Sequence, residues 1–149
     1  MNTAAAEKTP IIVLDTNVLV AGLCRREHSP SYRILKNIQT GRVPLALTQK
    51  LFLEYEAVLT RNRVLKLIDA TSDEVQMILN ALVVIARESE VHYLWRPNLR
   101  DESDNFVLET AVASGALIVT KNIRDFSSSE LQFPELVIST PQQFGDLYL

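Results

Sequence analysis

The sequence has 149 residues, of which 47% are hydrophobic and 22% charged, with a formal net charge of −3 at pH 7. This length and apolar content are enough for one domain with a sizeable core. The negative charge excludes long-range attraction of nucleic acid by the protein as a whole, so action on a phosphate backbone needs a local basic patch or bound cations.

The single cysteine, Cys24, excludes an intramolecular disulfide and favours a reducing cytoplasm. With only two histidines, it is also a poor zinc-binding set. Residues 1–10 lack the apolar core of a signal peptide and are expected to be a flexible tail. No apolar run reaches the roughly 18 residues that span a bilayer. We therefore expect a cytoplasmic protein without a membrane segment, whose residues 11–149 form one domain.

The first predicted element is a buried strand. Four consecutive aliphatic residues, Ile11 to Leu14, predict a strand covered on both faces, as in a parallel sheet. Asp15 follows it directly. Ligands of open parallel sheets bind beyond the carboxyl ends of the strands, so Asp15 stands where a functional residue is expected. Alternatively, Asp15 only caps the helix expected at 16–23.

A second helix is predicted to begin at Ser29-Pro30, with Ser29 as its cap, and to end at Gly41. Tyr32, Leu35 and Ile38 recur at a spacing of three and are expected to form its buried face.

The rest of the chain alternates between strands and helices in the same way. Thr71 and Glu74 form a capping box that opens the longest helix, to about Arg87. The other predicted elements are strands at 44–47, 91–94, 116–120 and 136–138, helices at about 49–59 and 104–113, a short apolar segment at 64–68, and a terminal helix from Pro141. This alternation predicts a single-domain α/β fold, in which helices cover both faces of a mostly parallel central sheet.

Four carboxylates are expected at the carboxyl edge of this sheet. Asp15 and Asp125 follow buried strands, whereas Glu54 and Asp104 lie near the starts of helices that follow strands. Glu54 and Asp104 also fall on the apolar sides of their helices; Asp104, for example, shares its side with Leu108. Burying a carboxylate in this way costs several kcal/mol unless something offsets the charge.

Crowded carboxylates can coexist by sharing protons or by binding a hard cation. An all-oxygen set suits Mg²⁺ or Mn²⁺ better than zinc or copper, and such ions promote attack on a phosphodiester. Each acid also has a simpler explanation: Glu54 as an exposed helix residue, Asp104 as a helix N-terminal charge, and Asp125 as a turn former. The prediction of a metal site therefore depends on their joint placement.

The motifs that carry these acids resemble those of the PIN domain, in the same order over about residues 11–145. They are Asp15-Thr16-Asn17-Val18-Leu19, Glu54, Asp101-Glu102-Ser103-Asp104-Asn105 leading into Leu108-Glu109-Thr110-Ala111, and Thr120-Lys121-Asn122-Ile123-Arg124-Asp125-Phe126. The chain is most similar to PIN proteins that are toxins of toxin–antitoxin pairs. The resemblance implies a PIN-like α/β/α sandwich, a metal-dependent ribonuclease, a homodimer, and neutralisation by a small antitoxin protein.

The resemblance also implies roles for individual residues. Asp15, Glu54, Asp104 and Asp125 would hold Mg²⁺ or Mn²⁺, with Thr16 and Thr120 orienting groups in the site and Asn17 belonging to the first motif. Many members have an acid where this chain has Asn122, so the fourth ligand is Asn122, Asp125 or a water held by either. Asp101 competes with Asp104 for the third position, and the helical phase favours Asp104.

The sequence leaves three alternative functions to compare. The first is an endoribonuclease selective for single-stranded RNA, with basic residues in loops contacting phosphates. The second is a phosphotransfer protein, but a phosphatase of that kind needs an acid where Asn17 stands, and a receiver domain needs an adjacent pair of acids at the end of its first strand. The third is a catalytically silent PIN-like module that binds RNA or protein.

Overall fold

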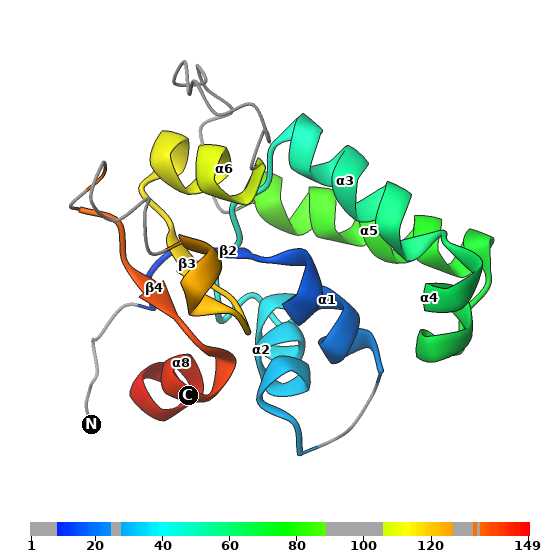
Figure 1. The fold of residues 1–149 in the computed structure, drawn as a ribbon, viewed down its shortest axis with the longest axis horizontal. Coiled ribbons are helices and arrows are strands. Elements are labelled where there is room, and N and C mark those ends of the chain that lie inside the picture. The colour runs from blue at the N-terminus through cyan, green and yellow to red at the C-terminus, as the bar shows by residue number, and fades with distance from the viewer. Residues whose placement is uncertain (1–8, 25–27, 89–105, 127–132, 134) are drawn as a thin grey trace.

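The computed structural model describes residues 9–24, 28–88, 106–126, 133 and 135–149. These residues form seven α-helices, three strands and one 3-10 helix (Figure 1). The strands are β2 (Ile12–Leu14), β3 (Leu117–Val119) and β4 (Ile138–Ser139). The helices are α1 (Thr16–Leu23), α2 (Pro30–Gln39), α3 (Gln49–Leu59), α4 (Asn62–Ile68), α5 (Ser72–Glu88), α6 (Phe106–Ser114) and α8 (Pro141–Tyr148), and η1 (Ile123–Phe126) is the 3-10 helix.

The described sheet is entirely parallel, with β3 between β2 and β4. Leu14 pairs with Val119 in this register, so β2 and β3 end side by side. All three residues of β2 and of β3 are buried, as their aliphatic runs predict. The predicted strand at 44–47 is reduced to one parallel bridge between Leu45 and Ile12. Pro44 has no N–H and cannot extend the pairing on the N-terminal side of this bridge.

Helices α2, α5 and α8 begin where local sequence signals predict, whereas α4 begins at Asn62 without a side-chain cap, where only a short apolar segment at 64–68 was expected. Ser29 Oγ accepts from the Tyr32 N–H at 3.0 Å, and Gly41, at a φ of +83°, follows the end of α2. Thr71 and Glu74 exchange hydrogen bonds of 2.9 and 3.1 Å as a capping box before α5. Thr140 and Gln143 do the same at α8. Caps of this kind each stabilise a helix by about 1 kcal/mol.

The predicted buried face of α2 is wrong by one residue along most of its length. Ser31, Ile34 and Ile38 are buried, whereas Tyr32 and Leu35 are only partly covered. The reason is the close approach of α1 at Gly22, where an added Cβ would lie 3.0 Å from the Ser31 carbonyl oxygen. Sequence spacing alone cannot anticipate which side of the helix this neighbour covers.

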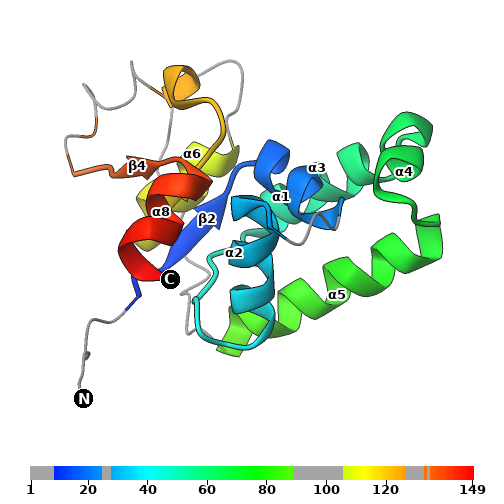
Figure 2. The same cartoon turned by 90° about the horizontal axis from the view of Figure 1, so that it is seen from below.

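Helices cover both faces of the sheet. Figures 1 and 2 show α6 on one face, α2 and α8 on the other, and α3, α4 and α5 extending to one side. This arrangement is the α/β/α fold that the sequence predicts. The predicted strand at 91–94 and the predicted helix start at Asp104 lie outside the described residues. No described helix is long and apolar enough to cross a membrane.

Candidate functional site

Asp15 is held at the carboxyl edge of the sheet by both of its oxygens. Its backbone N–H donates to the Val119 carbonyl at 2.9 Å, which continues the β2–β3 pairing by one residue. Oδ1 accepts from the Thr16 N–H at 2.8 Å, and Oδ2 accepts from the buried Thr120 hydroxyl at 2.7 Å. Asp15 therefore does cap α1, and it also faces the end of the neighbouring strand.

Glu54 reaches the same edge from α3. The Thr16 hydroxyl donates to Glu54 Oε2 at 3.0 Å, so Thr16 touches one carboxylate with its N–H and the other with its side chain. Next to Glu54, the fully buried Tyr55 donates its hydroxyl to the Leu14 carbonyl at 2.5 Å. This bond fixes α3 against the last residue of β2, directly before Asp15.

The segment after β3 brings Asn122 and Asp125 to the same region. The Asn122 N–H donates to the Thr120 hydroxyl oxygen at 3.0 Å, and Asn122 Nδ2 donates to Asp125 Oδ1 at 3.1 Å. Asp125 lies in η1, the short helix that follows, and both side chains are exposed. Hydrogen bonds thus run from Asp125 through Asn122 and Thr120 to Asp15.

Asn17 connects helix α1 to the segment that follows β3. Its Oδ1 accepts from the Lys121 N–H at 3.3 Å, which ties the first turn of α1 to the segment after β3. Its side chain also hydrogen-bonds Asp15 and thereby favours the ionised form of that carboxyl.

The electrostatics of the site favour a proton or a cation at Asp15. Burial raises the pKa of Asp15, the hydrogen bonds from Thr120, Thr16 and Asn17 oppose this shift, and the negative charge of Asp125 adds to it. Burial also raises the pKa of Tyr55 well above its ordinary value, and the charges of Asp15 and Glu54 raise it further. Among the described residues, no Lys or Arg is a cause of either shift.

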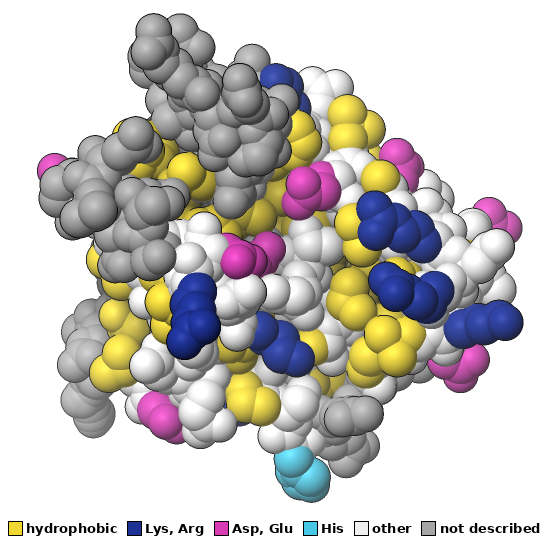
Figure 3. Space-filling view, viewed as in Figure 1, with side chains coloured by type: hydrophobic (Ala, Val, Ile, Leu, Met, Phe, Trp, Pro, Cys, Tyr) yellow, Lys and Arg dark blue, Asp and Glu magenta, His cyan; other side chains and the backbone are white. Residues whose placement is uncertain are grey.

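Three of the four acids that the sequence predicts as metal ligands, Asp15, Glu54 and Asp125, lie among the described residues. Thr16 hydrogen-bonds both Asp15 and Glu54, and the charge of Asp125 acts on Asp15. Even so, within residues 9–24, 28–88, 106–126 and 135–149 no three Asp, Glu, His or Cys side chains converge on a common point. Asp101 and Asp104 lie outside the described residues. Figure 3 shows acidic side chains near the centre of one face, with Lys and Arg side chains on both sides of them.

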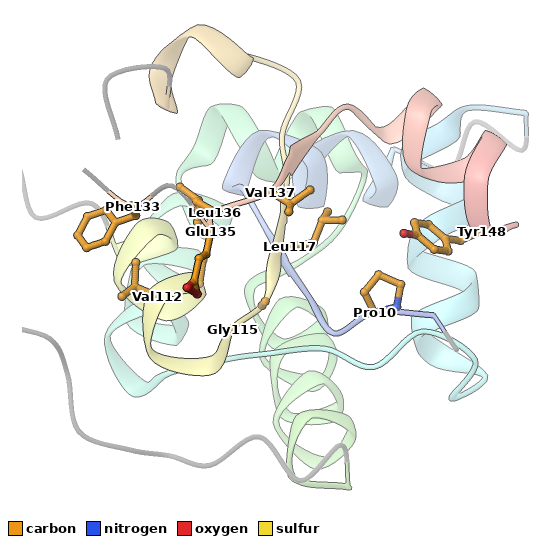
Figure 4. A pocket seen from close by; sticks show the side chains of 11 residues that line it. Pro10, Val112, Gly115, Leu117, Phe133, Glu135, Leu136, Val137 and Tyr148 are labelled. Atoms are coloured by element: carbon orange, nitrogen blue, oxygen red, sulfur yellow. The ribbon is translucent and has the colours of Figure 1, made fainter. Parts of the chain in front are cut away.

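A separate cavity of about 580 Å³ lies at the opposite, amino edge of the strands. Its lining includes Pro10 before β2, Leu117 at the start of β3, and Val137 before β4 (Figure 4). Glu135 is the only Asp or Glu among the described residues that line it. The acidic edge, and not this cavity, is therefore the candidate active site.

Sequence reasoning did not identify the part that Tyr55 plays. Its spacing places it among the apolar residues of α3, and nothing local indicates that its hydroxyl meets a backbone carbonyl 41 positions earlier. The sequence offers one signal. Tyr55 directly follows Glu54, a predicted site residue, and the hydroxyl of a buried tyrosine needs a hydrogen-bond partner.

Comparison with known proteins agrees with this architecture. The family model of the PIN domain matches residues 11–124, which contain the sheet edge and most of the helices around it. No curated protein matches the chain. Because the match covers most of the sequence, the chain belongs to the PIN domain family, whose members are generally nucleases that use divalent metal ions.

Proposed function

We propose that this protein is a metal-dependent endoribonuclease that cuts phosphodiester bonds of single-stranded RNA. The observation that carries the proposal is the pair of bonds from Thr16, which holds Asp15 and Glu54 side by side at the carboxyl edge of the sheet. Burial raises the pKa of Asp15, and no described cation offsets its charge, so the edge is suited to a divalent ion.

The proposed ligands are Asp15, Glu54, Asp104 and Asp125, with Mg²⁺ or Mn²⁺ as the ion. Their oxygen donors suit a hard cation. Asp104 precedes the described start of α6 by two residues, and α6 packs against β2 and α3, which lead to Asp15 and carry Glu54. The proposal also assigns Asn122 to holding Asp125, on the evidence of their 3.1 Å hydrogen bond.

In this mechanism a bound divalent ion supplies an activated water and offsets charge on the phosphodiester. The chain's own residues keep the acids in place. The Thr120 hydroxyl and the Thr16 N–H fix the two oxygens of Asp15, and the Thr16 hydroxyl fixes one oxygen of Glu54. These neutral donors orient the carboxylates without cancelling the negative charge that attracts the ion.

The biological assignment extends the same proposal. From the resemblance we propose a toxin of a toxin–antitoxin pair, which acts in the cytoplasm as a homodimer and is neutralised by a small antitoxin protein. We also propose that residues 11–149 form the nuclease domain and that residues 1–10 are a tail.

One observation favours a second function, a catalytically silent PIN module that binds RNA or protein. The part of the chain that the structure describes brings no three metal-binding side chains together. A silent module would bind RNA equally well with or without divalent ions.

Cleavage assays separate the two functions. The purified protein should cut single-stranded RNA in Mg²⁺ or Mn²⁺ more readily than a duplex of the same sequence, and EDTA should stop it. Asp15→Asn should abolish cutting, whereas Asp73→Asn, an exposed acid in the first turn of α5, should leave it unchanged. Normal cutting by Asp15→Asn would show that the site is wrongly assigned.

A further inference from the structure

Three basic side chains gather where α3 ends and α4 begins. Arg61 directly precedes α4, and Arg63 and Lys66 lie one helical turn apart within it. All three side chains are exposed, and none of them forms an ion pair with an Asp or Glu that the structure describes. The chain has no acid between Glu56 and Asp69 that could offset their charge. These three residues form a locally basic patch, here called the α4 surface, on a protein whose net charge is −3.

The α4 surface adjoins the candidate site. Arg61 follows Glu54 by seven residues, which along a helix is about two turns, or about 10 Å. α4 packs against α3, which carries Glu54, and against α1, which begins with Thr16. Figure 3 shows Lys and Arg side chains to the right of the acidic ones, in the region where Figure 1 places α4. A strand that lies across the acids can therefore reach the α4 surface on the same face of the molecule.

A strand of RNA needs such a surface next to the acids. A bound divalent ion offsets charge at the phosphodiester that is cut, but the neighbouring phosphates still lie against an edge that carries Asp15, Glu54 and Asp125. The net charge of the protein repels them as well. Cations within reach of these neighbouring phosphates supply the attraction that the acids and the net charge do not.

The composition of the α4 surface favours contacts to phosphates over contacts to bases. Residues 56–74 contain no aromatic side chain on which a base could stack. Stacking on aromatic side chains is how many proteins hold the bases of a single strand. Arg and Lys, in contrast, bind phosphate oxygens, and such contacts position a strand without distinguishing its sequence.

From these observations we propose that the α4 surface binds phosphates of the RNA strand on one side of the cut, without reading the bases. The inference rests on the proposed ribonuclease function and adds to it the path of the strand, from the acids along α3 toward α4. Arg61 contacts the phosphate nearer the acids, and Arg63 and Lys66 contact those beyond it. The packing of α4 against α3 and α1 holds these cations in place relative to the acids.

The first test measures RNA binding by the full-length protein in EDTA, where no metal-dependent cleavage occurs. Fluorescence anisotropy of a labelled single-stranded RNA gives the Kd over a range of salt concentrations. Arg61→Gln, Arg63→Gln and Lys66→Gln should each reduce the slope of log Kd against log salt concentration by about 0.7, the value for one phosphate contact on a single strand. Each should also raise the Kd roughly fivefold at about 0.1 M salt, and the triple variant should lose about 2 from the slope.

A second triple variant is the matched control. Arg33→Gln, Lys36→Gln and Arg42→Gln together remove three exposed cations from α2 and the segment after it. Both triple variants change the net charge equally, so a difference between them reports on the α4 surface and not on the charge of the whole protein. The control should keep the wild-type slope. Thermal unfolding measured by circular dichroism verifies that all variants fold.

The identity of the bases provides a further test. Because the proposed contacts are to phosphates, poly(A) and poly(U) of equal length should lose affinity for the α4 triple variant by the same factor. A loss confined to one of the two sequences would show that the α4 surface reads bases and would contradict the proposal.

The outcomes distinguish this inference from the function on which it rests. Wild-type slopes in the α4 variants, or an equal loss in both triple variants, would overturn the α4 surface even if the protein cuts RNA. A loss confined to the α4 variants would support it even if the protein cuts nothing. Where the wild type cuts, the α4 triple variant should raise KM and keep kcat, because contacts away from the cut are the same in the ground and transition states. A lower kcat at unchanged KM would instead assign these residues to the reaction itself and overturn the proposal.

Discussion

The Thr16 hydroxyl donates to the Glu54 carboxylate at 3.0 Å, although 38 residues separate them in the sequence. The backbone N–H of the same threonine donates to Asp15 at 2.8 Å. One residue therefore contacts both carboxylates and fixes how they lie relative to each other. The proposed metal site depends on this contact, and so do several measurable properties of the protein.

Replacing Thr16 tests whether this arrangement matters for activity. Thr16→Val keeps the shape of the side chain but removes the hydroxyl, so Glu54 loses its donor. Cleavage should fall by about 10- to 100-fold, as for other residues that orient metal ligands. Thr16→Ser keeps the hydroxyl and should retain most of the activity. Equal rates for Thr16→Val and the wild type would show that the contact does not position Glu54.

Tyr55→Phe tests the bond that fastens α3 to the end of β2. Its loss removes a buried hydrogen bond to the Leu14 carbonyl and should lower the free energy of unfolding by about 1–3 kcal/mol. For a protein of this size each kcal/mol lowers the Tm by about 2–4 °C. Tyr32→Phe, at a partly covered tyrosine of α2, is the control and should change the Tm much less.

The raised pKa of Asp15 predicts how the metal-free protein responds to pH. Burial raises the pKa in the folded state above its ordinary value near 3.8, so the folded state binds this proton more tightly than the unfolded state does. The stabilisation is complete below the ordinary value and is lost as pH rises through the raised one. Urea unfolding in EDTA should show this loss in the wild type but not in Asp15→Asn. A wild-type profile that rises over the same pH range relative to that of the variant would contradict the direction of the shift.

Asp101 and Asp104 can be separated by the same substitution at each position. If Asp104 completes the site, Asp104→Asn should abolish RNA cutting, while Asp101→Asn should keep a substantial part of it. The reason is that a lost metal ligand removes the ion's charge from the reaction, whereas a nearby acid that is not a ligand changes only the local potential. The reverse pattern of rates would assign the third position to Asp101.

The fold was predictable wherever its signals are local. Ser29, Thr71 and Thr140 start helices because each cap bonds a donor three residues away, so a short stretch of sequence contains both partners. Predictions that depend on tertiary neighbours were less accurate. The last strand is Ile138–Ser139 and not 136–138, since its limits depend on pairing with β3.

The same distinction applies to the site. Asp15 and the end of the next strand were expected at one edge because parallel strands align their carboxyl ends. Neither motif alone predicts the hydrogen bond from Thr120 to Asp15, because the two residues lie 105 positions apart in the sequence. The part that Tyr55 plays emerges only when α3 is packed against the end of β2.

The most direct test of the metal site is a Mn²⁺ titration of the wild type and of Asp15→Asn, followed by the electron paramagnetic resonance signal of free Mn²⁺. The wild type should remove Mn²⁺ from solution saturably, and Asp15→Asn should lose this binding while its metal-free unfolding stays close to that of the wild type. If the wild type binds no Mn²⁺, or if Asp15→Asn binds it with unchanged affinity, the acids at the end of β2 and β3 are not a metal site.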